Sequence, residues 1–266
     1  MKLKGKVAII TGAALGFKEG GPSIGGAIAL KFASEGAKIV AIDINEEMGN
    51  KTIAKILDQG GEGIYIKVDV SNTEQVKDAL KVIEKSFKSL NILVNCAASY
   101  KGDIFKNVVD IPETDWQNIL NVNLNGYFRF AKYSIPLMLK SGGGSIVNIS
   151  SCAAFQVNKN FCVYPVSKAA INALTRSIAV DFAPQIRCNA ICPGFVRIAN
   201  SENERSSEEI KKWISGIAKK YPMQRVCTTE EIANVTLFLA CDDSSYMNGQ
   251  CLIVDGGKII SENHEF

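Results

Sequence analysis

The sequence predicts an α/β protein with a doubly wound, seven-stranded parallel sheet flanked by helices. Two observations support this fold class: short apolar runs rich in β-branched residues alternate with amphipathic helical segments, and a glycine-rich segment directly follows the first run. The 266 residues contain no linker or internal repeat, so residues 1–266 are expected to form a single domain. The expected strands are 7–10, 38–42, 63–68, 92–95, 144–149, 185–191 and 250–254.

The first expected strand begins a strand, loop, helix and strand unit. The run 7–10 leads into Gly12, and six glycines lie from position 12 to position 26. Apolar residues then recur at helical spacing from Ile24 to Phe32, and the next strand ends at Asp43. This order is that of a Rossmann-type dinucleotide-binding fold, in which glycines let the backbone approach the pyrophosphate.

Four residues of this unit are expected to contact a dinucleotide. Gly12 would let the backbone approach the pyrophosphate, and Ser23 would cap the helix and bind the same group. Ile24, the next residue, is expected to contact the cofactor as well. Asp43 would accept hydrogen bonds from the adenosine ribose and would repel a 2′-phosphate. Because no Arg or Lys stands at positions 44 and 45, NAD is favoured over NADP.

A tyrosine and a lysine stand four residues apart in Tyr164-Pro-Val-Ser-Lys168. Such a pair shares one face of a helix, so the ammonium of Lys168 is expected to lower the pKa of Tyr164 from its ordinary value of about 10. Ser151, thirteen residues before the tyrosine, would hold a carbonyl or alcohol oxygen in front of it. These residues predict a site that moves a proton on and off a C–O bond.

The remaining periodic segments predict helices. The expected helices are 71–88, a long one within 115–140, 164–181 and one around 208–219. Segment 195–222 differs in character, because its first part is polar and rich in turn formers. We expect this segment to be a substrate lid, while a surface loop followed by a solvated helix fits the same composition.

These motifs together resemble the short-chain dehydrogenase/reductase family, and the resemblance covers nearly the whole chain. The other motifs of the family occur in order: Asp69-Val70, Asn95-Cys96-Ala97-Ala98, Asn121-Val-Asn123, Ile146-Val-Asn-Ile-Ser-Ser151, Pro193-Gly194 and Val254-Asp-Gly-Gly257. The resemblance implies a nicotinamide dinucleotide cofactor and hydride transfer to or from a substrate carbon. It also implies a homotetramer, with a homodimer as the alternative.

The resemblance assigns roles to four catalytic residues. Tyr164 would be the general acid/base, and Ser151 would orient and polarise the substrate oxygen. Lys168 would lower the tyrosine pKa and hold the nicotinamide ribose, while Asn123 would hold a water that links Lys168 to solvent. Two neighbours compete for the serine and asparagine roles, Ser150 and Asn121, and the spacing to the tyrosine favours Ser151.

Further site residues follow from the resemblance. The expected cofactor contacts, besides those above, are Asp69, Val70, Asn95, Ala97, Pro193, Gly194 and Val196. The substrate pocket is expected around Ser99, Tyr100, 153–160, Phe195 and the lid. The chain departs from the family in a glycine loop enlarged at 17–23, in Ile198 where a Thr is common, and in Ala98 where a glycine is usual. Lys18, in the enlarged loop, would reach a phosphate or remain a solvated loop residue.

Composition argues against several other classes of function. The net charge is only +3, without a basic arm, so no nucleic-acid partner is expected. The apolar runs are too short for a membrane span, and the N-terminus has no apolar stretch of signal-peptide length, so a cytoplasmic protein is expected. The eight cysteines form no Cys-x-x-Cys pair and the only histidine is His264, so no metal site is expected.

The reaction expected first is NAD-dependent oxidation of a secondary alcohol, such as a polyol, a sugar, or a cyclic or steroid alcohol, or reduction of the corresponding ketone. Reduction of a 3-oxoacyl thioester or of another carbonyl is the alternative. Enoyl reduction is more distant, because the Tyr–Lys spacing of four differs from the usual spacing in such enzymes. A dinucleotide-binding regulator without turnover is disfavoured, because the Asn, Ser, Tyr and Lys of the site are all present.

Overall fold

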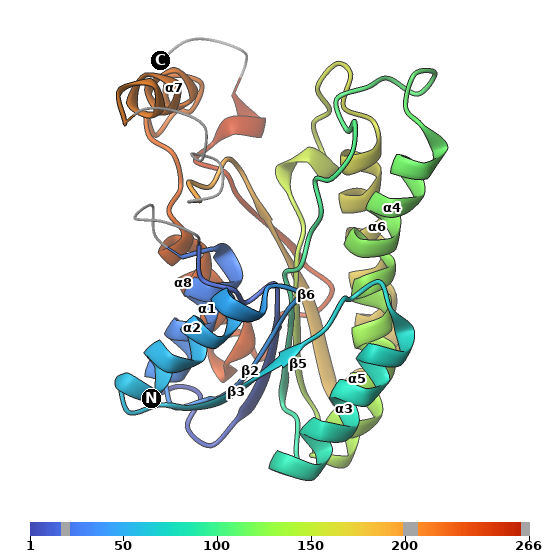
Figure 1. The fold of residues 1–266 in the computed structure, drawn as a ribbon, viewed down its shortest axis with the longest axis vertical. Helices are drawn as coiled ribbons and strands as arrows, with labels where there is room; N and C mark the ends of the chain where they lie inside the picture. Colours follow the sequence, from blue (N-terminus) through green and yellow to red (C-terminus); the bar gives the residue numbers. More distant parts are fainter. Residues whose placement is uncertain (17–21, 199–206, 262–266) are drawn as a thin grey trace.

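A computed structural model describes residues 1–16, 22–198 and 207–261 (Figure 1). Its core is a seven-stranded sheet in the order β3-β2-β1-β4-β5-β6-β7, and every pair of neighbouring strands is parallel. The predicted fold class is therefore confirmed. The strands are β1 (Val7–Thr11), β2 (Lys38–Asp43), β3 (Glu62–Lys67), β4 (Ile92–Asn95), β5 (Gly144–Ile149), β6 (Ile186–Pro193) and β7 (Cys251–Val254), each within two residues of its predicted bounds.

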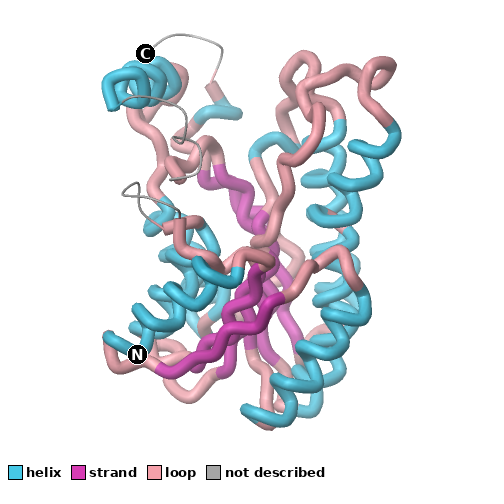
Figure 2. Tube along the Cα trace, viewed as in Figure 1, coloured by secondary structure: helices cyan, strands magenta, loops and turns pink. Residues whose placement is uncertain are grey.

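Helices cover both faces of the sheet (Figures 1 and 2). One face carries α1 (Ile24–Ser34), α2 (Glu46–Asp58) and α8 (Thr229–Ala240). The other carries α3 (Thr73–Phe87), α4 (Glu113–Asn123), α5 (Asn125–Lys140) and α6 (Val163–Asp181). The helix α7 (Ser207–Ala218) lies apart from both layers, beyond the carboxyl end of the sheet at the top of Figure 1.

Each face of the sheet has its own apolar core. Ile28 and Phe32 of α1 are fully buried in one core, and Phe130 of α5 is fully buried in the other. Burial of apolar area on both faces is the main stabilising contribution in such a fold. It also explains why the strands appear in the sequence as continuous apolar runs rather than as alternating patterns.

The long helix expected within 115–140 is α5, and a second helix, α4, precedes it in the same range. The chain breaks at Leu124, between α4 and α5. The guanidinium of Arg129 donates to the backbone oxygen of Asn121 at 3.1 Å and to its side-chain oxygen at 2.7 Å. A side chain thus binds a carbonyl at the end of α4 that a continued helix would have bound, and α5 begins at Asn125.

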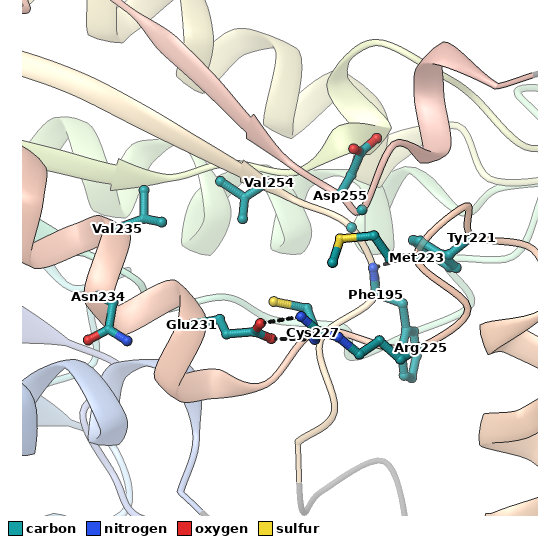
Figure 3. Close-up of a pocket in the computed structure, with 12 residues that line it drawn as sticks. Phe195, Tyr221, Met223, Arg225, Cys227, Glu231, Asn234, Val235, Val254 and Asp255 are labelled. Carbon is teal, nitrogen blue, oxygen red and sulfur yellow. Dashed lines mark hydrogen bonds and ion pairs between the residues drawn. The ribbon is translucent and has the colours of Figure 1, made fainter.

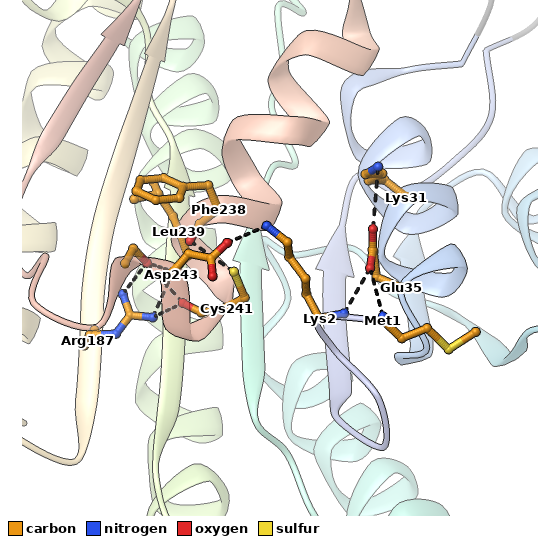
Figure 4. Close-up of polar contacts among 10 residues, drawn as sticks. Met1, Lys2, Lys31, Glu35, Arg187, Phe238, Leu239, Cys241 and Asp243 are labelled. Carbon is orange, nitrogen blue, oxygen red and sulfur yellow. Dashed lines mark hydrogen bonds and ion pairs between the residues drawn. The ribbon is translucent and has the colours of Figure 1, made fainter.

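Polar contacts hold the layers together at the end of the sheet opposite to the strand carboxyl ends (Figure 4). Lys2 pairs with Asp243, which follows α8, and its backbone amide donates to the Glu35 carboxylate at 2.9 Å. The Arg187 guanidinium donates to the carbonyl oxygens of Leu239 and Cys241, each at 3.1 Å. The Arg187 contacts satisfy carbonyls at the end of α8. All of these contacts lie away from the carboxyl edge of the sheet, where the candidate site lies.

All eight cysteines are free thiols, so no disulfide links the elements. Within the described ranges, each helix is too short or too polar to span a bilayer.

Candidate active site

Two cavities adjoin at the carboxyl edge of the sheet. One, of about 620 Å³, is lined from the ends of β1, β2 and β4, and the other, of about 740 Å³, is lined from the ends of β5 and β6 and from α6. Ala98, which follows β4, lines both cavities. They lie where the strand order reverses, between β1 and β4. Ligands of doubly wound sheets bind at such a switch point.

The start of α1 has the features of a pyrophosphate site. Ser23 caps the helix, and its hydroxyl accepts from the backbone amide of Gly26 at 3.0 Å, as predicted. A Cβ at Gly25 would lie 2.2 Å from the carbonyl oxygen of Gly12, whose φ of +68° also favours glycine. The turn therefore packs directly on the helix N-terminus, where the field favours an anion. The expected role of Lys18 and most of the enlarged loop, 17–21, lies outside the described residues.

Asp43 lies in the wall of the 620 Å³ cavity with Gly12, Asp69, Val70 and Ala97. Its carboxylate accepts from the backbone amides of Ala14 and Asn45, each at 2.9 Å. These two bonds fix the orientation of the carboxylate at the end of β2. The residues present thus fit a dinucleotide, with an anion site at α1 and a hydrogen-bond acceptor at Asp43.

Asn95 is 1 % exposed, and its side-chain amide donates to the Asn148 side chain on β5 at 2.9 Å. This bond joins β4 to β5, and Asn95 is not among the lining residues of either cavity. Its expected contact with a cofactor stays a prediction. Thr11 supports the same region, because its hydroxyl accepts from the amides of Cys96 and Ala97 at 3.0 and 3.1 Å.

Ser151, Tyr164 and Lys168 all line the 740 Å³ cavity, together with Ile24, Pro193, Gly194 and Val196. The strand β5 delivers Ser151, and α6 delivers Tyr164 and Lys168 on one face, as the spacing predicted. Ser150 also lines this cavity, but its hydroxyl is already used in donating to the carbonyl oxygen of Lys168 at 3.0 Å. The geometry therefore favours Ser151 over Ser150 for contact with a ligand.

Lys168 is buried beneath the cavity. Its Nζ donates to the carbonyl oxygen of Ile149 at 2.9 Å and lies 5.5 Å from the ring centres of both Tyr127 and Tyr164. Burial lowers the pKa of Lys168 to about 8, because desolvation disfavours the charged ammonium.

The pKa of Tyr164 differs from the prediction. Burial raises it well above 10, and Tyr100 raises it further, while a hydrogen bond with Ser151 acts in the opposite direction. The Lys168 ammonium lies over the ring face and bonds to Ile149, so it does not meet the phenol oxygen. Desolvation of the phenolate therefore outweighs the effect expected from the lysine.

Asn123, at the end of α4, has a fully buried side chain that lines neither cavity. Its Oδ1 accepts from the Ser99 amide at 2.7 Å, and its Nδ2 donates to the Ser99 carbonyl at 3.3 Å. Asn123 thus fixes the loop after β4, which carries Ala98 and Tyr100. The predicted water between Asn123 and Lys168 stays a prediction.

Aromatic residues form much of the 740 Å³ cavity. Tyr100, Phe195 and the lid residue Trp213 lie where a pocket was expected, whereas Phe105 was not expected, and the expected stretch 153–160 is absent from the lining residues. The rings of Phe195 and Trp213 meet edge to face, with their centres 5.2 Å apart. Phe105 comes from a loop without any fixed spacing to the motifs, so no sequence signal marks it.

The expected lid contributes to the same cavity. Phe195, Val196, Ile198 and Trp213 of segment 195–222 line it, while 199–206 lies outside the described residues. Behind Phe195, a further cavity of about 320 Å³ contains the paired side chains of Arg225 and Glu231 (Figure 3). Its Tyr221 hydroxyl accepts from the Phe195 amide at 2.9 Å, which fixes the backbone at the mouth of the site.

Comparison with known proteins gives a consistent result. The family model described as Enoyl-(Acyl carrier protein) reductase matches residues 21–258. A 3-oxoacyl-[acyl-carrier-protein] reductase of Thermotoga maritima is 35% identical over 98% of this chain and 100% of its own length. A 3beta-hydroxysteroid dehydrogenase of Mediterraneibacter gnavus is 34% identical over 95% of this chain and 94% of its own.

Among solved structures, the ligand-free aldohexose dehydrogenase of Thermoplasma acidophilum superposes with a TM-score of 0.86. It is 36% identical, and the match covers 99% of this chain and 98% of that one. These proteins differ in the substrates that their names state, but each is named as a reductase or a dehydrogenase. With the Ser, Tyr and Lys gathered at one cavity, these matches show that the chain belongs to the short-chain dehydrogenase/reductase family of oxidoreductases.

Proposed function

We propose that the protein is an NAD-dependent oxidoreductase that interconverts an uncharged secondary alcohol and its ketone, with Tyr164 as the general acid/base. The observation that carries the proposal is the convergence of Ser151, Tyr164 and Lys168 on one cavity, which adjoins the dinucleotide cavity at Ala98. A substrate in the 740 Å³ cavity would therefore lie next to a cofactor in the 620 Å³ cavity.

The site residues would divide the work on the C–O bond. Tyr164 would give a proton to the ketone oxygen in reduction and take it back in oxidation, and Ser151 would donate a hydrogen bond to the same oxygen. Because burial raises the pKa of Tyr164, its protonated form dominates at neutral pH, which suits the reductive direction. A nicotinamide dinucleotide, when bound, supplies the hydride.

The preference for NAD rests on Asp43. Its carboxylate is held by two backbone amides at the end of β2, where the ribose of a dinucleotide binds in this fold. A 2′-phosphate placed there would meet a fixed negative charge, and the chain has Ile44 and Asn45 next, without a cation.

An uncharged substrate is supported by the lining of the 740 Å³ cavity. Its described lining residues are mostly aromatic and aliphatic, and the one charged side chain among them, Lys168, already donates to the Ile149 carbonyl. A buried carboxylate or phosphate there would lack a cationic partner among those residues, which is costly. The hydroxysteroid and aldohexose named for two relatives are both uncharged and bear hydroxyl groups.

The test is NADH formation from NAD⁺ across a panel of polyols, aldoses, cyclic diols, hydroxysteroids and 3-hydroxyacyl thioesters. We expect turnover of one uncharged class, at least about tenfold faster with NAD⁺ than with NADP⁺. Tyr164→Phe should lower the rate by a factor of roughly 10² to 10⁴, because the proton carrier is lost. NADH binding to that variant, measured by fluorescence, should persist.

Three results would contradict this proposal in different ways. Faster turnover with NADP⁺ would remove the role given to Asp43. Turnover confined to thioesters would favour the oxoacyl reductase, the activity that the name of one relative states. Intact NADH binding with no turnover of any panel member, in either direction, would favour the dinucleotide-binding regulator.

A further inference from the structure

Tyr100 lies directly against Tyr164, the residue on which the proposed chemistry depends. Their hydroxyl oxygens are 2.9 Å apart, and their rings stack with centres 5.1 Å apart and planes inclined by 27°. The stack continues from Tyr164 to Phe161 and from Phe161 to Phe105, each with ring centres 5.2 Å apart. Tyr164 is thus part of a row of four aromatic rings, and Tyr100 forms one end of it.

The position of the Tyr100 hydroxyl is that required of a substrate oxygen. A group that exchanges a proton with Tyr164 must come within about 2.6–3.2 Å of its hydroxyl. The Tyr100 oxygen satisfies this distance, and a phenol hydroxyl donates and accepts hydrogen bonds as an alcohol does. The Tyr100 side chain therefore has the chemical form of a ring that bears a hydroxyl, presented to the general acid/base.

Tyr100 is also able to leave this position at low cost. The residue is 55 % exposed, and it belongs to a loop, 96–112, that forms neither helix nor strand. The contacts that hold it at Tyr164 are one hydrogen bond and one ring stack. The base of the loop stays fixed, because Asn123 binds both backbone groups of Ser99.

We propose that the space in front of Tyr164 taken by the Tyr100 side chain is a subsite for an uncharged ring that carries a hydroxyl or keto group, and that Tyr100 withdraws when such a ring binds. The ring of the ligand would stack on Tyr164, and its oxygen would replace the Tyr100 hydroxyl. Tyr100 then acts as an internal competitor. The apparent affinity of the protein for such a ligand is the intrinsic affinity multiplied by the fraction of molecules in which Tyr100 has withdrawn.

The subsite can be tested without any turnover, with p-cresol as the probe. This molecule is the tyrosine side chain in free form, and Tyr100→Ala removes its competitor from a half-exposed loop position. Because one hydrogen bond and one ring stack hold Tyr100, calorimetry should show p-cresol binding to Tyr100→Ala about tenfold or more tighter than to the wild type. Tyr100→Phe, which keeps the ring, should lie between the two.

Two further variants localise the probe. Adding Tyr164→Phe to Tyr100→Ala should weaken p-cresol binding about fivefold or more, because the phenol loses its partner. Tyr246→Ala removes a fully exposed tyrosine elsewhere and should bind p-cresol as the wild type does. Equal binding to wild type and Tyr100→Ala, or no effect of Tyr164→Phe, would overturn the subsite.

The inference that the subsite serves a substrate rests on the proposed function, and a second measurement separates the two. With a cyclic alcohol that the wild type oxidises, Tyr100→Ala should lower KM about tenfold. An increased KM would show that Tyr100 is a fixed wall of the substrate site and would overturn its withdrawal. If p-cresol binds as expected but no alcohol is oxidised, the subsite stands and the proposed function fails.

Discussion

The site residues show how burial changes the chemistry that a sequence motif implies. The spacing of Tyr164 and Lys168 correctly places both on one face of a helix, at one cavity. Spacing alone carries no information on desolvation, and in the structure desolvation dominates: it raises the pKa of Tyr164 and lowers that of Lys168 to about 8. The ammonium of Lys168 donates to the Ile149 carbonyl oxygen and not to the phenol of Tyr164.

The lowered pKa of Lys168 predicts a pH dependence of stability. In the unfolded chain this lysine binds its proton up to about pH 10.4, so between pH 8 and that value the unfolded state holds more protons than the native state. The contribution of Lys168 to the free energy of unfolding should therefore rise with pH. From pH 7.5 to 9.5, the free energy of unfolding in urea should increase by roughly 2 kcal/mol in the wild type relative to Lys168→Met.

Other titrating groups do not obscure this comparison. The thiols that interact with Lys168, those of Cys96 and Cys192, have native pKa values raised above this pH range, so they keep their protons in both proteins. The raised pKa of Tyr164 acts in the opposite sense, but only above about pH 10, where the unfolded tyrosine loses its proton first. A difference between the two proteins that stays constant with pH would show that the native Lys168 keeps an ordinary pKa.

At the scale of elements, the sequence predicts best what burial and backbone conformation determine locally. All seven strands were located, because strands buried on both faces form apolar runs bounded by turns. The Ser23 cap was located because its chemistry is local. The break at Leu124 was not, because the helical period continues through it and the contact of Arg129 with Asn121 arises only after packing. The bond from Asn95 to Asn148 was not predicted for the same reason, since its partner lies on another strand.

Alanine substitutions at two helix glycines should have opposite effects on stability, because only Gly25 packs against the turn at Gly12. Gly25→Ala should destabilise the fold by about 1–3 kcal/mol, because the added Cβ would lie 2.2 Å from the Gly12 carbonyl oxygen. It should also weaken NADH binding, since α1 must shift. Gly216→Ala in α7 is the matched control: its Cβ meets nothing within 4 Å, and alanine favours helix by up to about 1 kcal/mol.

Urea denaturation and NADH titration of both variants would check this expectation. If Gly25→Ala proved as stable as Gly216→Ala, the close packing of α1 on the turn would not exist in solution.

At the scale of the whole molecule, the sheet separates two cores that share no helix. Ile28 of α1 is buried in one core, and Ile135 of α5 is buried in the other. Each Ile→Val change should lower the free energy of unfolding by about 0.5–1.5 kcal/mol. Because the sites lie on opposite faces and have no shared partners, the double variant should lose the sum, within about 0.5 kcal/mol. Chemical denaturation of the two single variants and the double variant measures this; a coupling above about 1 kcal/mol would mean that the sheet transmits packing strain between its faces.

The hydroxyl of Thr11 has a consequence for how the molecule can vary over evolution. The ladder between β1 and β4 ends at Ile10 and Val94, and beyond it the Thr11 hydroxyl accepts from the next two amides of the β4 side. One side chain therefore ties the two walls of the crevice together without using the loops on its two rims. A change of loop length on either rim, such as the enlargement at 17–23 that the sequence indicates, would leave this tie in place.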